Sequence, residues 1–178
     1  MILESHCHSY HSFDCQTSIE QIIISCKKNN ISCIAITDHD CFNLQKKEIL
    51  AFSRNKIKLL KAIEFTTSEG VHIIGLSPNI KTIEKPAYHY SLVLLIQQIK
   101  KLKGTIIIPH PSHHTGLLGN KNVDKQTQEY VAKAANFYEK LNYKYDKILP
   151  NHEAFFKNNN INLKSIIGSD AHVSKDIG

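Results

Sequence analysis

Several features that are common in other classes of protein are missing from this sequence. It contains no tryptophan and one methionine, its only arginine is Arg54, and it has no long hydrophobic run. The longest apolar segments, such as residues 105–109, have the length of a strand and fall far short of the roughly 18–20 residues of a membrane-spanning helix. The N-terminal residues also lack the basic and apolar regions of a secretory signal. We therefore expect a cytoplasmic protein with no membrane partner.

The cysteines do not form the pattern of a disulfide framework. There are 5, an odd number, and no two of them stand in a C-x-x-C pair. Disulfide frameworks are rare in cytosolic proteins of this size, so free thiols are expected. Cys26 and Cys33 lie in apolar-patterned segments and are expected to be small buried side chains. The other three, Cys7, Cys15 and Cys41, each adjoin a histidine or an aspartate, which leaves a cysteine nucleophile with a histidine base as an alternative.

Composition and charge are those of one ordinary globular domain. The chain has 178 residues, of which 42% are hydrophobic and 21% charged, and this excludes the disordered and fibrous classes. Its length is enough for a core that folds without disulfides. The net charge of +6 comes from lysines scattered along the chain, with no basic stripe interleaved with aromatics. A dedicated nucleic-acid surface is therefore disfavoured, while a biased composition and a surface that attracts phosphate-bearing substrates both stay open.

Hydrophobic patterning predicts alternating strands and helices. Strands are expected at residues 2–3, 32–36, 58–63, 71–76, 105–108, 145–149 and 165–167. Helices are expected at about residues 18–28, 44–54, 87–103, 125–140 and 152–159, with Ser18 as the N-cap of the first. This alternation predicts a parallel sheet with crossover helices, either an open doubly wound sheet or a trimmed barrel of about seven strands.

Histidine and carboxylate side chains accompany almost every predicted strand. The set takes in more than half of the 11 histidines and consists of His6, His8, Asp14, Asp38, His39, Glu64, His72, His110, Asp170 and His172. Because the carboxyl ends of the strands of a parallel barrel share one rim, we expect these side chains to converge. His6 and His8 are two residues apart on an extended segment, so their side chains point to the same side.

The residue types in this set predict a metal centre. Imidazole and carboxylate ligands, with no need for thiolate, suit Zn²⁺, Mn²⁺ or Fe²⁺. The set is too large for one tetrahedral ion, so two or three divalent ions are expected, bridged by a carboxylate such as that of Glu64. Ions about 3.5–4 Å apart are typical of enzymes that catalyse in-line displacement at phosphorus.

The same residues form an ordered series of motifs. These are His6-Cys7-His8-Ser9 with Asp14, Ile36-Thr37-Asp38-His39-Asp40, Ala62-Ile63-Glu64, Val71-His72-Ile73-Ile74-Gly75-Leu76, Pro109-His110-Pro111 and Gly168-Ser169-Asp170-Ala171-His172. The series resembles the motifs of the PHP (polymerase and histidinol phosphatase) domain family along the whole chain, residues 1–178. The resemblance implies a single α/β domain, a distorted (β/α)7 TIM-like barrel. The chain stops soon after the last motif, so we also expect that a short C-terminal extension is missing from it.

The resemblance further implies a trinuclear centre. One metal would be held by His6, His8, Glu64 and Asp170, a second by Glu64, His72 and His110, and a third by Asp14, His39 and His172. Asp38 would orient His39 or a neighbouring residue rather than bind a metal itself. An inward-facing core position is the alternative for His72, which lies in the segment V-H-I-I-G-L.

By the same resemblance, the activity would be metal-dependent hydrolysis of a small phosphomonoester or a nucleotide. A hydroxide activated by the metals would attack phosphorus in line, and a histidine would protonate the leaving group. The candidates for this proton donor, each of which could equally be a solvated loop residue, are His11, His113 and His114.

One departure from the family concerns the grip on substrate. Many phosphatases of the family have an arginine shortly after the His-Pro motif, where this chain has Ser112-His113-His114. Bidentate binding of phosphate by arginine is therefore not expected. Other histidines, Lys121 or the backbone amides of Gly116 and Gly119 could hold the phosphate instead.

Two other functions are kept as alternatives. A nuclease that removes 3′ nucleotides would need a basic groove with stacking aromatics, for which the sequence gives weak support. A non-catalytic interaction module could keep the metal centre for structure alone, but such modules usually lose ligands, and here every expected position is present. The sequence leaves the oligomeric state and the identity of the metal open.

Overall fold

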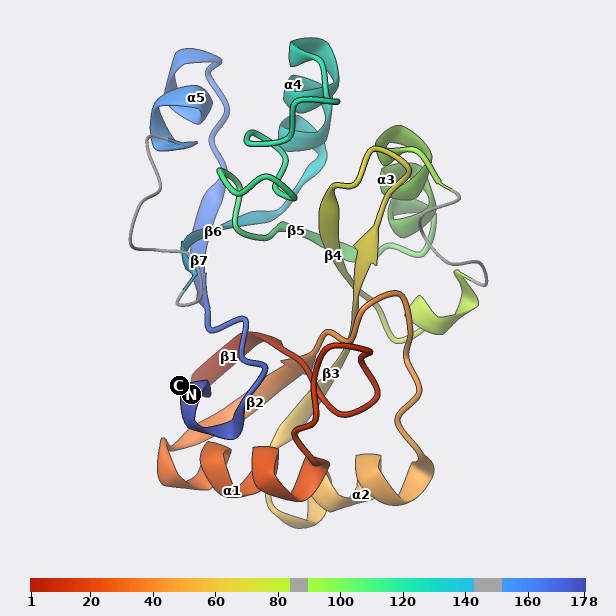
Figure 1. Cartoon of the computed structure of the whole chain (residues 1–178), viewed down its shortest axis with the longest axis vertical. Helices are drawn as coiled ribbons and strands as arrows, with labels where there is room; N and C mark the ends of the chain where they lie inside the picture. Colours follow the sequence, from red (N-terminus) through yellow and green to blue (C-terminus); the bar gives the residue numbers. More distant parts are fainter. Residues whose placement is uncertain (84–89, 143–151) are drawn as a thin grey trace.

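The computed structural model describes residues 1–83, 90–142 and 152–178, which form a seven-stranded sheet with helices around it (Figure 1). The strands are β1 (Ile2–Cys7), β2 (Ile31–Ile36), β3 (Lys58–Thr66), β4 (His72–Leu76), β5 (Thr105–Ile108), β6 (Phe137–Asn142) and β7 (Lys164–Gly168). The helices are α1 (Ile19–Lys28), α2 (Lys46–Arg54), α3 (Leu92–Lys101), α4 (Lys125–Ala134) and α5 (His152–Asn158), with short 3₁₀ turns at Ile80–Thr82 and Ser174–Asp176. None of the helices described is long and apolar enough to cross a membrane.

The sheet follows the order of the strands in the chain, β1 to β7, and is nearly closed into a barrel. At the seam, Cys7 of β1 forms a bridge with Ala171, which follows β7. The His8 amide donates a hydrogen bond to the Ala171 carbonyl at 3.0 Å, and the Asp170 amide donates to the His6 carbonyl at 2.9 Å. The two ends of the chain therefore lie together, as the N and C marks in Figure 1 show. The predicted α/β barrel is confirmed, and the open doubly wound sheet is excluded.

One strand corrects the prediction of an all-parallel sheet. β4 pairs antiparallel with both of its neighbours, β3 and β5. Only residues 67–71 join β3 to β4, in a tight turn that the Thr67 amide closes on the Val71 carbonyl at 2.9 Å. Gly70 occupies the left-handed region of this turn, with φ of 76°. Such a connection is too short for the crossover that parallel strands need, so β4 has to run backwards.

The helix predicted over residues 125–140 is wrong in its second half. α4 ends at Ala134, and the next residues form β6, parallel to β5. Asn136 fixes the chain at this point: its amide donates to the Ile106 carbonyl at 2.9 Å, and its side-chain oxygen accepts from the Ile106 amide at 2.8 Å. The aromatic pair that follows also favours a strand. The strand predicted at 145–149 and the start of the helix predicted at 87–103 lie outside the described residues.

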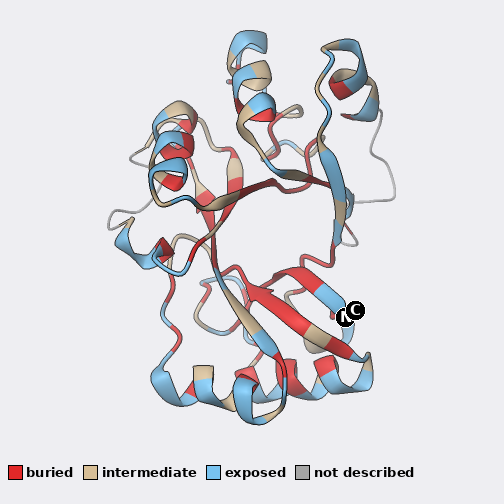
Figure 2. Cartoon of the chain, turned by 180° about the vertical axis from the view of Figure 1, so that it is seen from behind, coloured by how far each residue is buried: buried red, intermediate tan, exposed pale blue. Residues whose placement is uncertain are grey.

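The faces of α1 and α3 that turn toward the sheet are apolar, as their periodicity predicts. Ser18 caps α1, accepting a hydrogen bond from the Gln21 amide, and this confirms the predicted N-cap. The buried residues of α1 and α3 recur at helical spacing: Ile19, Ile22, Ile23 and Cys26 in one, and Leu92, Leu95, Ile96 and Ile99 in the other. A second, smaller cluster of Ala35, Ala62, Ile74 and Ile107 packs strand against strand. Figure 2 shows buried residues along the strands and on the inner faces of the helices.

Candidate metal centre

Glu64 of β3 lies at the centre of the converging histidines. It is 1% exposed, and its two carboxylate oxygens face different partners. Oε2 lies 3.0 Å from His6 Nε2 and 3.1 Å from His8 Nε2. Oε1 lies 3.1 Å from both His72 Nδ1 and His110 Nε2. A carboxylate placed in this way has the geometry to bridge two neighbouring cations.

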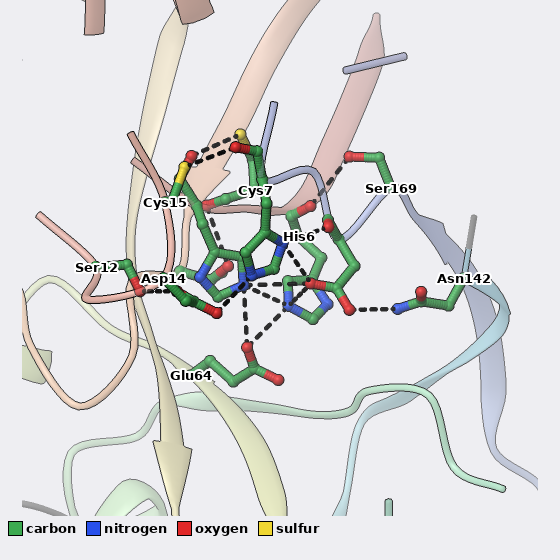
Figure 3. A network of polar contacts seen from close by, with 12 residues as sticks. His6, Cys7, Ser12, Asp14, Cys15, Glu64, Asn142 and Ser169 are labelled. Atoms are coloured by element: carbon green, nitrogen blue, oxygen red, sulfur yellow. Dashed lines mark hydrogen bonds and ion pairs between the residues drawn. The ribbon is translucent and has the colours of Figure 1, made fainter. Parts of the chain in front are cut away.

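The first group of candidate ligands consists of His6, His8, Glu64 and Asp170, whose ligand atoms all lie within 4.8 Å of one another. The Nε2 atoms of His6 and His8 are 3.1 Å apart, and Asp170 Oδ1 lies 3.4 Å from the first and 3.3 Å from the second. All four residues are buried. The Nδ1 atom of His8 is buried with no hydrogen-bond partner among the described residues. The ligand atoms of the four residues thus surround one shared position, and in Figure 3 the side chains of His6 and Glu64 are turned toward it.

Strong electrostatic coupling follows from this packing. Burial by itself lowers the pKa of His8, but hydrogen bonds to Asp170 and Glu64 outweigh it and raise that pKa to about 9. Burial also opposes charge on His6, yet the carboxylates of Asp170, Glu64 and Glu139 raise its pKa well above the usual value. The pKa of Glu64 is held well below its usual range by His6 and His72, against the opposing effect of burial. In the metal-free protein, protons on the imidazoles therefore balance the buried carboxylates.

A second group gathers Asp14, His39 and His172 around His8, again with ligand atoms within 4.8 Å. Asp14 Oδ2 lies 2.7 Å from His172 Nε2 and 3.5 Å from His39 Nε2. The other ring nitrogen of His172 lies 2.8 Å from the backbone carbonyl of Asp170, which can only accept a hydrogen bond. That contact leaves Nε2 of a neutral His172 as an acceptor facing a carboxylate oxygen, so a proton or a cation has to lie between them.

A third group consists of His39, Glu64 and His72. His110, which the resemblance implies beside Glu64, lies there at 3.1 Å although it is not in this group. His39, which the resemblance assigns to the third metal, also lies 3.7 Å from Glu64, so Glu64 has one histidine more around it than the resemblance implies. His72 is the first residue of β4, and because β4 runs antiparallel to β3 and β5, its start lies at the same rim as the ends of those two strands. Its ring is half-buried and directed at Glu64 rather than into an apolar core.

Asp38 supports the loop after β1 rather than the ring of His39. Its two oxygens accept hydrogen bonds from the Ser9 amide at 2.6 Å and the Ser9 hydroxyl at 2.7 Å. Ser12, in the same loop, donates to Asp14 Oδ1 at 2.7 Å and accepts from the His39 amide at 3.2 Å. This loop therefore ties His39 to Asp14.

The predicted proton donors lie in different places. His11 is turned toward α2, where its Nε2 lies 3.0 Å from Glu48 Oε2. The ring of His113 contacts that of His110 at 5.5 Å between centroids, and its Nδ1 lies 2.9 Å from the Thr115 hydroxyl. Burial, together with His110, lowers the pKa of His113 to about 4. His114 is exposed, and its ring lies 4.0 Å from that of His113.

The loop after β5 also bears on how phosphate could be held. The Gly116 amide donates to the His113 carbonyl at 2.8 Å, and the Gly119 amide to the Pro111 carbonyl at 3.1 Å. Both predicted backbone donors are therefore used within the loop. Lys121 is exposed in the same loop, whereas Arg54 ends α2 on the outside of the barrel.

Sequence reasoning missed Glu139, a buried carboxylate of β6 that contacts His6 and His110. The segment was assigned to a helix, in which this residue would have had no fixed direction. An acidic residue inside a strand that ends at the rim is the signal that could have found it.

Comparison with known proteins gives the family. Residues 4–173 match the model of the PHP domain, and the chain belongs to that family. No curated protein matches the sequence.

Solved structures share the fold. A two-domain protein of Bacteroides vulgatus containing a predicted PHP-like metal-dependent phosphoesterase superposes with a TM-score of 0.71 at 16% identity, covering 96% of this chain and 51% of that one. PsfC of Pseudomonas syringae gives a TM-score of 0.71 at 14% identity, covering 99% and 78%. Endonuclease Q, in complex with a 27-mer duplex that carries an abasic lesion, gives 0.67 at 14% identity, covering 97% and 49%. The chain thus spans about half the length of the first and third of these proteins.

Proposed function

We propose that this protein hydrolyses a phosphate ester, a small phosphomonoester or a nucleotide, at a centre of two or three divalent metal ions. The observation that carries the proposal is the convergence of imidazole nitrogens and carboxylate oxygens on Glu64, with ligand atoms grouped within 4.8 Å. The donor set suits Mn²⁺, Zn²⁺ or Fe²⁺. The assignment agrees with the family to which the chain belongs.

The ligands divide into three overlapping groups. One ion would be held by His6, His8, Glu64 and Asp170, another by Glu64, His72 and His110 beside His39, and a third by Asp14, His39 and His172. When bound, the ions supply Lewis acidity, lowering the pKa of a water toward neutrality and offsetting the charge of the phosphate. Glu64 sets the spacing of the first two groups, because each of its oxygens faces one of them.

We assign the remaining steps to residues of the loop after β5. A histidine with a pKa of about 4 is neutral near pH 7, so the ring of His113 holds no imidazolium proton that it could give to the leaving group. We therefore assign protonation of the leaving group to the exposed ring of His114, which packs against His113. We assign the binding of phosphate to Lys121, an exposed lysine of this loop, since the amides of Gly116 and Gly119 donate within the loop. His11 is left out of this role because Glu48 holds it.

The test is metal content together with turnover. The protein would be loaded with Mn²⁺, Zn²⁺ or Fe²⁺ and assayed on p-nitrophenyl phosphate, a panel of phosphomonoesters and a single-stranded oligonucleotide. Asp170→Asn should lower both metal content and turnover, the latter by more than about 100-fold. Glu20→Gln, an exposed residue in the first turn of α1, is the matched control and should change neither.

The outcomes separate the alternatives. Turnover of the oligonucleotide alone would favour a nuclease, and endonuclease Q is one protein with a similar fold that binds a duplex substrate. Stoichiometric metal with no turnover of any substrate would leave a non-catalytic metal-binding module and refute the proposal.

A further inference from the structure

Glu139 and Asn142 form a buried polar pair next to the candidate metal centre, on the opposite side from Glu64. Both lie on β6 and are 1% exposed. The side-chain Nδ2 of Asn142 donates a hydrogen bond to Glu139 Oε2 at 2.8 Å. Neither residue belongs to any of the three groups of candidate ligands found among the described residues.

The pair contacts three candidate ligands at once. Glu139 Oε1 lies 2.8 Å from His6 Nδ1, and Oε2 accepts a hydrogen bond from the His110 amide at 2.9 Å. Asn142 Nδ2 lies 3.4 Å from Asp170 Oδ2. Figure 3 shows the amide of Asn142 directed at the cluster. One side-chain pair on β6 therefore spans residues of β1, the loop after β5 and the loop after β7.

We propose that Glu139 and Asn142 are positioning residues that pre-set His6, His110 and Asp170 for metal binding. This inference rests on the metal centre proposed above. A carboxylate can only accept hydrogen bonds, so Glu139 selects the tautomer of His6 that carries its proton on Nδ1. When a cation binds, Nδ1 keeps the proton that it donates to Glu139, and Nε2, which faces Glu64, His8 and the shared ligand position, is the ring nitrogen that gives its proton up. Outer partners of this kind orient ligating imidazoles and raise their basicity.

The pair also contacts two candidate ligands that have an unusual backbone conformation. His110 and Asp170 both have positive φ, 28° and 51°, which is costly for residues with a side chain. Glu139 binds the amide of the first, and Asn142 contacts the carboxylate of the second. Glu139 thereby holds the backbone of His110, and Asn142 holds the side chain of Asp170, whose amide donates to the His6 carbonyl.

Gly168 shows how closely the barrel is fitted around this carboxylate. A Cβ atom at this position would lie 2.2 Å from Glu139 Oε1 and 2.9 Å from His6 Cβ. Glycine therefore leaves room for the contact between Glu139 and His6.

The decisive variant is Glu139→Gln. Two donors, the His110 amide and Asn142, meet at Oε2, so the glutamine oxygen should take that place and its NH₂ group should face His6 Nδ1. His6 would then have to carry its proton on Nε2, the atom needed for the metal. We expect the affinity for Zn²⁺, measured by competition with a chelator, to fall about 10–100-fold.

Glu4→Gln is the matched control. Glu4 is also a buried carboxylate beside His6, but none of its hydrogen-bond partners is an imidazole: one oxygen, Oε1, accepts from the backbone amides of His6 at 3.0 Å and Ser169 at 3.2 Å, and the Ser169 hydroxyl adds a side-chain hydrogen bond. A glutamine oxygen can accept both, so this variant should bind Zn²⁺ like the wild type. An NMR spectrum of the Zn²⁺-loaded protein should show a protected His6 Nδ1 proton in the wild type and in Glu4→Gln, and not in Glu139→Gln.

Wild-type Zn²⁺ affinity and a retained Nδ1 proton in Glu139→Gln would overturn the inference, as would an equal loss of affinity in the two variants. If Glu139→Gln does not fold, Asn142→Ala decides: lowered affinity with a native circular dichroism spectrum supports the inference, and unchanged affinity overturns it. A wild-type protein that takes up no Zn²⁺ would overturn the inference together with the metal centre. A protein that binds Zn²⁺ as described but hydrolyses no phosphate ester would refute only the proposed function.

Discussion

Stability of the metal-free protein should fall as the pH rises from 6.5 to 9. His8 is fully buried, and contacts with Asp170 and Glu64 raise its pKa from 6.5 to about 9. A group whose pKa is higher in the folded than in the unfolded state stabilises the fold. This stabilisation is fully present below the unfolded pKa of 6.5 and is lost as the pH rises through the folded pKa. This single group corresponds to about 3 kcal/mol, and His6, whose pKa is also raised, acts in the same direction.

Thermal unfolding in the presence of a chelator measures the effect. A change of about 3 kcal/mol should lower the melting temperature of a chain of this size by about 6–12 °C between pH 6.5 and 9. We end the pH range at 9 because partly buried thiols such as that of Cys41, whose pKa is raised to about 11, ionise in the unfolded chain first and so destabilise the fold at higher pH. Metal-loaded protein should lack this loss, since ions bind deprotonated imidazole.

His114→Asn is a control that leaves the cluster intact, because His114 is exposed. It should preserve the slope of stability against pH. A metal-free wild type with a melting temperature that is flat between pH 6.5 and 9 would show that His8 is not charged in the folded state, and the electrostatic account of the cluster would be wrong.

Three further results are expected. Binding of Zn²⁺ at pH 7 should release protons from His6 and His8, so the calorimetric heat should vary with the ionisation enthalpy of the buffer; a heat independent of the buffer would contradict their charged state. Gly168→Ala should cost about 1–3 kcal/mol of unfolding free energy in urea, because the new methyl group meets the Glu139 carboxylate; no measurable change would mean that the barrel yields there. Ile96→Ala on α3, where the side chain is fully buried, should cost about 2–5 kcal/mol in the same assay, and a value below 1 kcal/mol would contradict the packing described.

The sequence is most informative where apolar periodicity and a helix-capping residue point to the same element. The buried face of α1 and its Ser18 cap follow directly from apolar spacing and a capping residue. The histidine motifs predicted which side chains converge, because strand order and a common rim limit where they can lie. The prediction that all strands are parallel is wrong for β4, because apolar spacing is the same in parallel and antiparallel strands. The direction of β4 could have been inferred from the short connection that contains Gly70.

Other features depend on distant partners. Residues 137–140 have a pattern compatible with a helix, and pairing with β5 decides in favour of a strand. Glu139 could not be assigned a role without that pairing, because its direction depends on it. His11 and His113 look equivalent by their closeness to ligand motifs, and only tertiary contacts, with Glu48 in one case and His110 in the other, separate them.

Closure of the barrel at the seam between β1 and β7 has a consequence for folding. Contacts there join residues at opposite ends of the chain, such as the Ser169 hydroxyl and the His6 carbonyl, which are 163 residues apart. Such contacts carry the highest loop-closure cost in the molecule and are expected to form late. During synthesis, His6 and His8 are made long before Asp170. This ligand group is therefore complete only once the barrel has closed, and in refolding of the metal-free protein Zn²⁺ should enter it only in the last kinetic phase.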